Sequence, residues 1–276
     1  MNDAYRPQQP PASGLGPTGL EAYKPAEIGP LIEAAGVAKT RLPLLSLAAL
    51  GGLAGAFIAF GALFYLAVLS GADPAYGPVR AAAGIAFSLG LILVIVGGAE
   101  LFTGNALLIM AWVDGRVTVR AVARNWIVVY LANFAGAGLI LGLVWLAGLD
   151  QGALAATAAE VALKKASLAP AELLGRGILC NVLVCLAVWL SFAARDAAGK
   201  VLVIVPPIAA FVALGFEHCV ANMFLLPFGM LAGAPIGPGD IAINLIWVTL
   251  GNLIGGGGGV AISYWAAYRP GTQPQR

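Results

Sequence analysis

Three titratable side chains lie deep within long apolar stretches of this sequence: Glu100, Glu217 and His218. An ionised side chain at the middle of a bilayer costs at least about 2.5 kcal/mol, so such a residue usually has a partner or a function. Histidine can donate, accept or exchange a proton near neutral pH, because its unperturbed pKa is about 6.5. These residues therefore predict hydrogen bonding or proton exchange with a small solute inside a membrane.

The two glutamates belong to a repeated motif. GAELFTGN (98–105) aligns without gaps with GFEHCVAN (215–222), and both segments carry the same glycine, glutamate and asparagine. We interpret Glu100 and Glu217 as structural residues, either protonated or hydrogen-bonded to backbone amides freed at a helix break; proton relay is the alternative. The only histidine of the chain, His218, has Leu101 as its counterpart. The repeat does not explain this histidine, and we predict a functional role for it rather than ordinary packing.

The composition argues against a water-soluble fold. Of the 276 residues, 60% are hydrophobic and 10% are charged, whereas about 25% are charged in an average soluble domain. The net charge of +2 provides no basic field for nucleic acid. The cysteines lie in apolar runs and predict buried thiols rather than a disulfide framework; they are Cys180, Cys185 and Cys219.

Six apolar stretches are each long enough to cross a bilayer core, which takes about 20 helical residues. They cover residues 44–69, 81–113, 125–149, 177–194, 201–230 and 241–267. As a single helix the second would be about 50 Å long, against a core of about 30 Å. We predict that the second helix is broken at Gly97 and Gly98, and the fifth at Pro206, Pro207 and Gly215.

A second pair of segments supports an internal duplication. NWIVVYLANFAGAG (125–138) matches NLIWVTLGNLIGGG (244–257) at seven of fourteen positions. Each half then holds three spans, an odd number, so the second half must be inverted in the membrane. The predicted fold is an all-α integral membrane protein with six transmembrane helices, arranged as two inverted three-helix repeats. Inverted-repeat transporters commonly place the solute path where discontinuous helices of the two halves meet.

The ends of the chain are polar. Residues 1–43 lack the apolar core of a cleaved signal peptide, so we predict a cytoplasmic tail in which Pro25–Lys39 forms a short amphipathic helix. The predicted domains are this tail, a six-span transport domain at 44–268 with repeats at about 44–149 and 173–268, and a cytoplasmic tail at 269–276. Eleven of the 15 Lys and Arg residues fall on the side of the termini, which indicates cytoplasmic ends.

Together with ILCNVLVCLAVW (178–189), the paired motifs resemble the formate/nitrite transporter family, whose members carry small monovalent anions. The similarity runs from about Ala26 to Tyr268, and several motifs agree in order and spacing. The resemblance implies an aquaporin-like protomer, a homopentamer with one path in each protomer, and the plasma membrane of a bacterium or archaeon. It implies a transporter and not an enzyme.

The resemblance also implies which residues line the path. His218 matches the central histidine of the family, and Thr103 matches a threonine on the broken second helix that can hydrogen-bond to it. The asparagines near the histidine and the breaks are Asn181, Asn222 and Asn252. The apolar residues that narrow the path are Phe87, Leu91, Leu101, Phe102 and Phe211. Lys165 matches the vestibule lysine that meets the anion from outside, with the adjacent Lys164 as the alternative.

An apolar constriction sets a physical problem for an anion, which must shed its water there. The Born cost of a bare carboxylate is of order 20 kcal/mol, reduced in practice to several, and protonation removes most of it. We expect Lys165 and the positive ends of the broken helices to attract the anion. His218 then lends or relays a proton, and Thr103 fixes which ring nitrogen faces the solute. A pure anion channel, with neutral His218 as a hydrogen-bond donor, is the alternative.

Formate is the first choice of substrate, because EAYKPAEI (21–28) resembles the formate-carrying branch of the family. Nitrite, hydrosulfide and acetate are alternatives of similar charge. From a different class, a water or glycerol channel fits the architecture, but its Asn-Pro-Ala motifs are missing, and an ammonium channel usually presents two histidines. We predict no cofactor and no metal, since no His and Cys cluster has ligand spacing. The glycine run 255–259 predicts close helix packing rather than a nucleotide loop.

Overall fold

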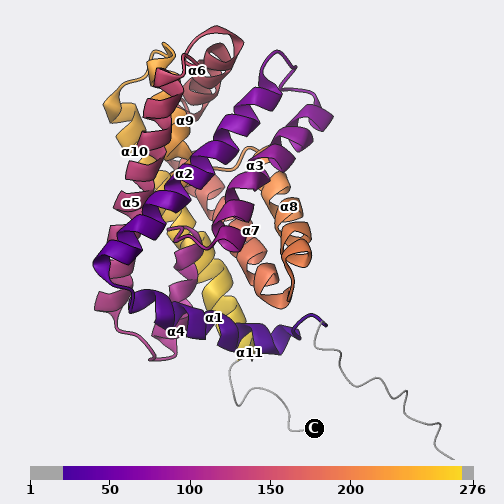
Figure 1. The fold of residues 1–276 in the computed structure, drawn as a ribbon, viewed down its shortest axis with the longest axis vertical. Helices are drawn as coiled ribbons and strands as arrows, with labels where there is room; N and C mark the ends of the chain where they lie inside the picture. Colours follow the sequence, from indigo (N-terminus) through magenta and orange to yellow (C-terminus); the bar gives the residue numbers. More distant parts are fainter. Residues whose placement is uncertain (1–20, 269–276) are drawn as a thin grey trace, which may run out of the picture.

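The structure, a computed structural model, describes residues 21–268, and almost all of them are helical (Figure 1). The elements of the first half are α1 (Pro25–Thr40), α2 (Leu44–Leu69), α3 (Gly77–Gly97), a 3-10 turn η1 (Gly104–Leu107), α4 (Leu108–Val113) and α5 (Val119–Leu146). Those of the second half are α6 (Gly152–Ala166), α7 (Pro170–Ala193), α8 (Ala197–Ala213), α9 (Cys219–Leu231), α10 (Pro238–Leu253), a π-helical segment η2 (Ile254–Ile262) and α11 (Ser263–Tyr268).

Within residues 21–268, five helices are long and apolar enough to cross a membrane: α2, α3, α5, α7 and the continuous run from α10 to α11. Shorter apolar helices follow the two predicted breaks, at Gly104–Val113 and Cys219–Leu231, and α8 is also short. The predicted fifth span is therefore two short helices, α8 and α9. This arrangement confirms an all-helical membrane protein in which the second and fifth apolar stretches are not single helices.

Both breaks are centred on a glycine with positive φ. α3 ends at Gly97 and is followed by Gly98 at φ 80°, while Gly215, at φ 71°, lies between α8 and α9. Glycine adopts this left-handed conformation at little cost because it has no Cβ. The sequence prediction was wrong about Pro206 and Pro207, since both lie inside α8 without ending it. Proline has a helical φ, and an apolar helix that packs on neighbours, as α8 does on α3 and α7, tolerates its missing hydrogen bond.

The two halves repeat the same helix pairings. α2 packs against α3 and α5, and in the same way α7 packs against α8 and α10. The contact between α2 and α5 is very close: a methyl group added at Gly55 would overlap the backbone carbonyl of Asn133. The neighbouring Gly52 has open space where its Cβ would lie. Gly55 is therefore required by the approach of two backbones.

We expect Gly55→Ala to destabilise the protein by at least about 1–3 kcal/mol, because the added methyl group overpacks a contact between two backbones. Gly52→Ala, three residues away on the same helix, is the control and should leave stability unchanged or slightly raised. The measurement is the midpoint of thermal unfolding in detergent for both variants. Equal midpoints for the two alanine variants would contradict the packing that we describe.

Two helices lie at opposite ends of the bundle, with α1 across the bottom of Figure 1 and α6 at the top. α1 covers the segment where a short amphipathic helix is predicted at Pro25–Lys39, whereas no helix is predicted at the position of α6. Arg116 donates to Glu33 of α1 at 3.1 Å. Burial raises the pKa of the Glu33 carboxyl, although Arg116 acts in the opposite direction. The predicted tail segments at 1–20 and 269–276 lie outside the described residues.

Candidate functional site

At each helix break, one asparagine side chain forms hydrogen bonds with the backbone. At the first break, the amide of Phe102 donates to Asn133 Oδ1 at 3.0 Å. Asn133 Nδ2 in turn donates to the carbonyls of Gly51 at 2.7 Å and Glu100 at 3.0 Å. A backbone that leaves a helix inside a membrane must find such partners, because no water is available there. Asn133 on α5 supplies them to the first break.

Asn252 on α10 forms the equivalent hydrogen bonds at the second break. Its Oδ1 accepts from the amide of Cys219 at 2.9 Å, and its Nδ2 donates to the carbonyls of Gly177 at 2.8 Å and Glu217 at 2.9 Å. The family resemblance predicts Asn252 as a path residue but does not point to Asn133. Both occupy the ninth position of the aligned segments 125–138 and 244–257, and that identity was the signal that could have found Asn133.

The two glutamates are paired with lysines, and this corrects the sequence interpretation. Glu100 forms an ion pair with Lys39 at 3.0 Å, and Lys165 donates to both carboxylate oxygens of Glu217 at 2.9 and 3.0 Å. We had expected the carboxylates to accept from freed backbone amides or to be protonated. The amides of Phe102 and Cys219 donate to Asn133 and Asn252 instead, and each carboxylate has a charged partner.

These ion pairs differ in burial. The side chains of Lys165 and Glu217 are 15% and 3% exposed, and those of Lys39 and Glu100 are 31% and 8% exposed. Two asparagines extend each pair. Asn105 donates to Glu100 at 2.8 Å and to Asn125 at 2.9 Å. In the same way, Asn222 donates to Glu217 at 2.7 Å and to Asn244 at 2.8 Å.

The lysines come from the two helices at the ends of the bundle, Lys39 from α1 and Lys165 from α6, each one residue before its helix ends. Lys39 is not among the predicted site residues, because it lies in a polar segment ahead of the first span. Of the two candidate lysines on α6, it is Lys165 that points to a glutamate, while the adjacent Lys164 is exposed. Each end of the protein thus contributes one lysine to one break.

His218 lies at the second break and reaches the first. Its Nε2 is 2.9 Å from Oγ1 of Thr103, and its Nδ1 accepts a hydrogen bond from the amide of Ala221 at 3.1 Å. The ring is 2% exposed and stacks on Phe211 with centroids 6.0 Å apart. Because Nδ1 is the acceptor, the neutral ring carries its proton on Nε2 and donates it to Thr103. The hydroxyl proton of Thr103 is then free to point elsewhere.

Two cavities approach this pair from opposite ends. One, of about 660 Å³, includes Lys39, Glu100, Leu91 and Leu101 in its lining. The other, of about 760 Å³, includes Lys165 and reaches His218. We call them the Lys39 cavity and the Lys165 cavity. The buried residues between them form a barrier that a solute crossing the protein has to pass.

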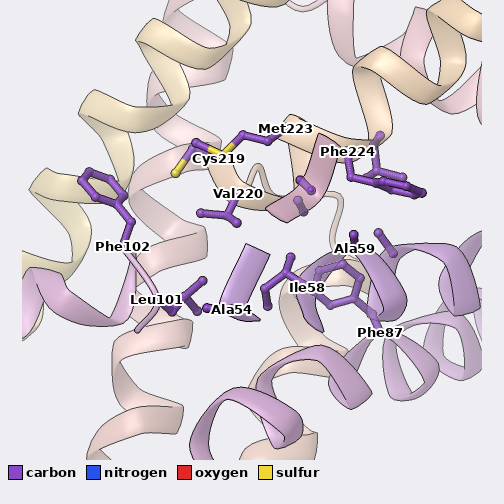
Figure 2. Close-up of a cluster of buried hydrophobic side chains, with 14 of the residues drawn as sticks. Ala54, Ile58, Ala59, Phe87, Leu101, Phe102, Cys219, Val220, Met223 and Phe224 are labelled. Carbon is purple, nitrogen blue, oxygen red and sulfur yellow. The ribbon is translucent and has the colours of Figure 1, made fainter. Parts of the chain in front are cut away.

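Four of the five predicted constriction residues line these cavities. Leu91 and Leu101 face the Lys39 cavity, whereas Phe87 and Phe211 face the Lys165 cavity and pack edge to face with centroids 5.6 Å apart. Phe102 lines neither cavity. Its ring packs edge to face on Tyr130 of α5 at 4.9 Å, and Figure 2 shows it apart from Leu101 and Phe87. The structure therefore gives Phe102 no cavity contact.

The same close-up shows how the breaks meet the first span. Leu101 from the first break and Val220 from the start of α9 lie around Ala54 and Ile58 of α2 (Figure 2), and all four belong to one buried apolar cluster. In the chain, the buried apolar residues Leu101 and Val220 each lie two positions from a member of the polar pair of Thr103 and His218. In apolar surroundings a hydrogen bond to a solute is stronger than in water, because water does not compete for it.

The asparagines of the sequence prediction lie behind the cavity walls. Asn181 Nδ2 donates to the carbonyls of Thr103 at 3.1 Å and Asn252 at 2.6 Å. Asn181, Asn222 and Asn252 are all buried, and none of them lines either cavity. Cys180, Cys185 and Cys219 are free thiols and fully buried, as predicted. Within residues 21–268 no cluster of His, Cys, Asp or Glu has an arrangement that could hold a metal ion.

The class of protein follows from this geometry: a multi-pass helical membrane protein with two opposed cavities that end at paired helix breaks. Comparison with known proteins specifies the class further. The family described as formate/nitrite transporter matches residues 26–266, and the chain belongs to this family. Members are transporters and channels rather than enzymes.

Individual relatives agree with this assignment. Formate channel FocA of Escherichia coli (strain K12) is 38% identical over 267 residues, which cover 88% of this chain and 94% of FocA. A solved structure named FNT family ion channel has a TM-score of 0.82 and 29% identity, covering 87% of this chain and 98% of that one. A pentameric formate channel with formate bound has a TM-score of 0.74 and 34% identity, covering 82% of this chain and 97% of that one.

Proposed function

We propose that this protein is a membrane channel for small monovalent anions, with formate as its main substrate. The proposal is supported by its membership of the formate/nitrite transporter family and by its similarity to FocA and to a channel with formate bound. The observation that carries it is the His218–Thr103 hydrogen bond between two cavities, each of which ends at apolar residues.

The first step is attraction of the anion into the Lys165 cavity. Four basic residues line this cavity, against two acidic ones, Glu160 and Glu217; the basic residues are Arg80, Lys164, Lys165 and Arg176. The surplus of positive charge favours a formate ion over a cation. The start of α9 adds a partial positive charge, since the aligned peptide dipoles of a helix make its N-terminus positive. The anion then meets Phe87 and Phe211, where it must lose its water.

The second step is passage past His218 and Thr103. Formate crosses the apolar barrier most easily as neutral formic acid, because protonation removes most of the desolvation cost. The Ala221 amide holds the neutral ring of His218 as an Nε2 donor, so the hydroxyl of Thr103 is the group able to donate to the solute. For His218 to lend a proton as a cation, its Nδ1 has to release this amide. The geometry favours hydrogen bonding of the solute by the pair.

The overall architecture that we propose has six transmembrane segments as two inverted repeats in an aquaporin-like protomer. The repeated helix pairings and the positions of α1 and α6 at opposite ends support it. We also propose a homopentamer, in line with the pentameric channel that the chain resembles, and a bacterial plasma membrane with both termini in the cytoplasm. The transport domain covers residues 44–268 in this proposal.

The test is uptake by the purified protein in proteoliposomes. We expect labelled formate to enter faster than into empty liposomes, and more so at lower external pH, where more formic acid is present. Labelled nitrite is measured beside it, and osmotic swelling with glycerol tests the neutral-solute channel. Faster nitrite than formate uptake would replace formate by nitrite, and swelling in glycerol without formate uptake would overturn the proposal.

A further inference from the structure

Equivalent contacts relate residues of the first half to residues of the second. The amide of Glu100 donates to the carbonyl of Leu50 at 3.1 Å, and the amide of Glu217 donates to that of Arg176 at 3.3 Å. Asn133 and Asn252 bind the next carbonyls, those of Gly51 and Gly177. Residues of α2 therefore correspond to residues of α7 with a fixed offset. This correspondence identifies the places where the second half departs from the first.

The departures nearest to the breaks fall on two elements. On α7, Asn181 and Cys185 stand where α2 has Gly55 and Ala59. In the break motifs, His218 replaces Leu101, and Thr103 stands in the first half where the second has Val220. In each of these four pairs an apolar or small residue in one half is matched by a residue with a hydrogen-bonding side chain in the other. These four residues are polar departures from the repeat.

All these departures meet at Thr103. Its hydroxyl binds His218, and its backbone carbonyl accepts from Asn181 at 3.1 Å and from the thiol of Cys185 at 3.5 Å. Thr103 and its three partners are at most 2% exposed. The carbonyl also accepts from the amide of Ala106 at 3.3 Å, and the two side chains from α7 add to this backbone bond. Thr103 is thus fixed both at its side chain and at its backbone.

The π-helical segment η2 provides the space that these side chains need. A methyl group added at Gly256 would overlap Asn181 Nδ2 and lie 2.7 Å from the sulfur of Cys185. The corresponding residue of the first half is Ala137, which lies in the regular helix α5. π-Helical turns are rare and often occur at functional sites. Gly256 and η2 thus accommodate the side chains that are absent from the first half.

We propose that Asn181, assisted by Cys185 and by the space at Gly256, is a positioning residue for transport that acts through Thr103. This inference rests on the proposed function and names residues that lie behind the path rather than in it. By holding the carbonyl of Thr103, Asn181 fixes the hydroxyl between His218 and the solute. A misplaced hydroxyl would lose its hydrogen bond to the solute at the barrier, where water offers no substitute.

The first test is a double-mutant cycle for formate uptake. Asn181→Ala should lower the rate about tenfold, the value of one hydrogen bond at the barrier. Thr103→Val introduces valine, the residue at the corresponding position of the second half. In this background Asn181→Ala should lower the uptake rate by less than about twofold, because the hydroxyl that Asn181 positions is gone. Equal losses in both backgrounds would mean general structural damage and overturn the inference. Absence of formate uptake by the unaltered protein would instead refute the proposed function.

The second test does not depend on transport. The S–H stretching band of Cys185 is identified in the infrared spectrum by its loss in Cys185→Ala, with Cys180→Ala, a buried thiol without a bond to Thr103, as the matched control. In Asn181→Ala the Cys185 thiol becomes the main side-chain donor to the Thr103 carbonyl, so its band should move to lower wavenumber. An unchanged band would show that Asn181 does not act on this carbonyl and would overturn the inference even if Thr103→Val is inactive.

Discussion

Replacing His218 by leucine, the residue at the corresponding position of the first half, is expected to lower formate uptake at least about hundredfold. The substitution removes the hydrogen bond to Thr103 and leaves an apolar side chain in the barrier. A loss of about 2.7 kcal/mol at the barrier corresponds to this factor, and burying an unpaired polar solute costs about 2–7 kcal/mol. The measurement is the initial rate of labelled formate uptake in proteoliposomes.

The smaller variant His218→Ala separates polarity from size. It opens space at the barrier, so uptake can persist, but we expect its dependence on pH to differ from that of the unaltered protein. Uptake by the unaltered protein should rise as the external pH falls. The control is an unchanged elution volume in detergent, which establishes that the assembly is intact. If the two pH profiles coincide, His218 has no part in handling the proton.

The second large effect is expected at the Lys165–Glu217 pair. Lys165→Met keeps the length of the side chain but leaves a carboxylate that is only 3% exposed without its cation. Breaking a buried ion pair by removing one partner typically costs about 3–5 kcal/mol. We expect a marked drop in the thermal unfolding midpoint. Adding Glu217→Gln should restore much of the lost unfolding temperature, because the glutamine carries no charge and can still bind Asn222.

Two comparisons make this prediction specific. Lys164→Met, on the exposed neighbour of Lys165, should leave the midpoint unchanged. Lys39→Met changes the corresponding position of the first half and should lower the midpoint less than Lys165→Met does. The reason is that Lys39 is 31% exposed, so water can solvate the carboxylate of Glu100 that remains. A double variant Lys165→Met/Glu217→Gln that is no more stable than Lys165→Met would rule out the charge explanation.

The sequence predicted the helical membrane class, the family and both helix breaks, because these follow from strong local patterns. Apolar stretches of sufficient length define the spans, and a glycine next to a repeated glutamate marks each break. The pairing of Thr103 with His218 was predicted through the family resemblance, and the structure places the two within hydrogen-bond distance. Pro206 and Pro207 misled the prediction, since packing on α3 and α7 carries α8 through them.

The partners of the glutamates could not be predicted from local patterns. Lys39 lies 61 positions before Glu100 in the chain, and Lys165 lies 52 positions before Glu217, so only the fold brings each pair together. Asn133 was within reach of the sequence, because it and Asn252 are identical in the aligned segments. The role of Asn181 depends on a departure from the repeat, and that departure has meaning only once its contact with Thr103 is known.

The lysine of α1 bears on how the protein evolved. Lys39 and Lys165 hold equivalent glutamates, and each lies at the end of a helix that precedes the first long helix of its half. A gene encoding three spans alone would have left both carboxylates without a counterion after it was copied. We infer that the ancestral gene already encoded the preceding helix, so that the duplication boundary lies ahead of α1 and α6. Deleting α1 would therefore remove part of one ancestral unit rather than an accessory tail.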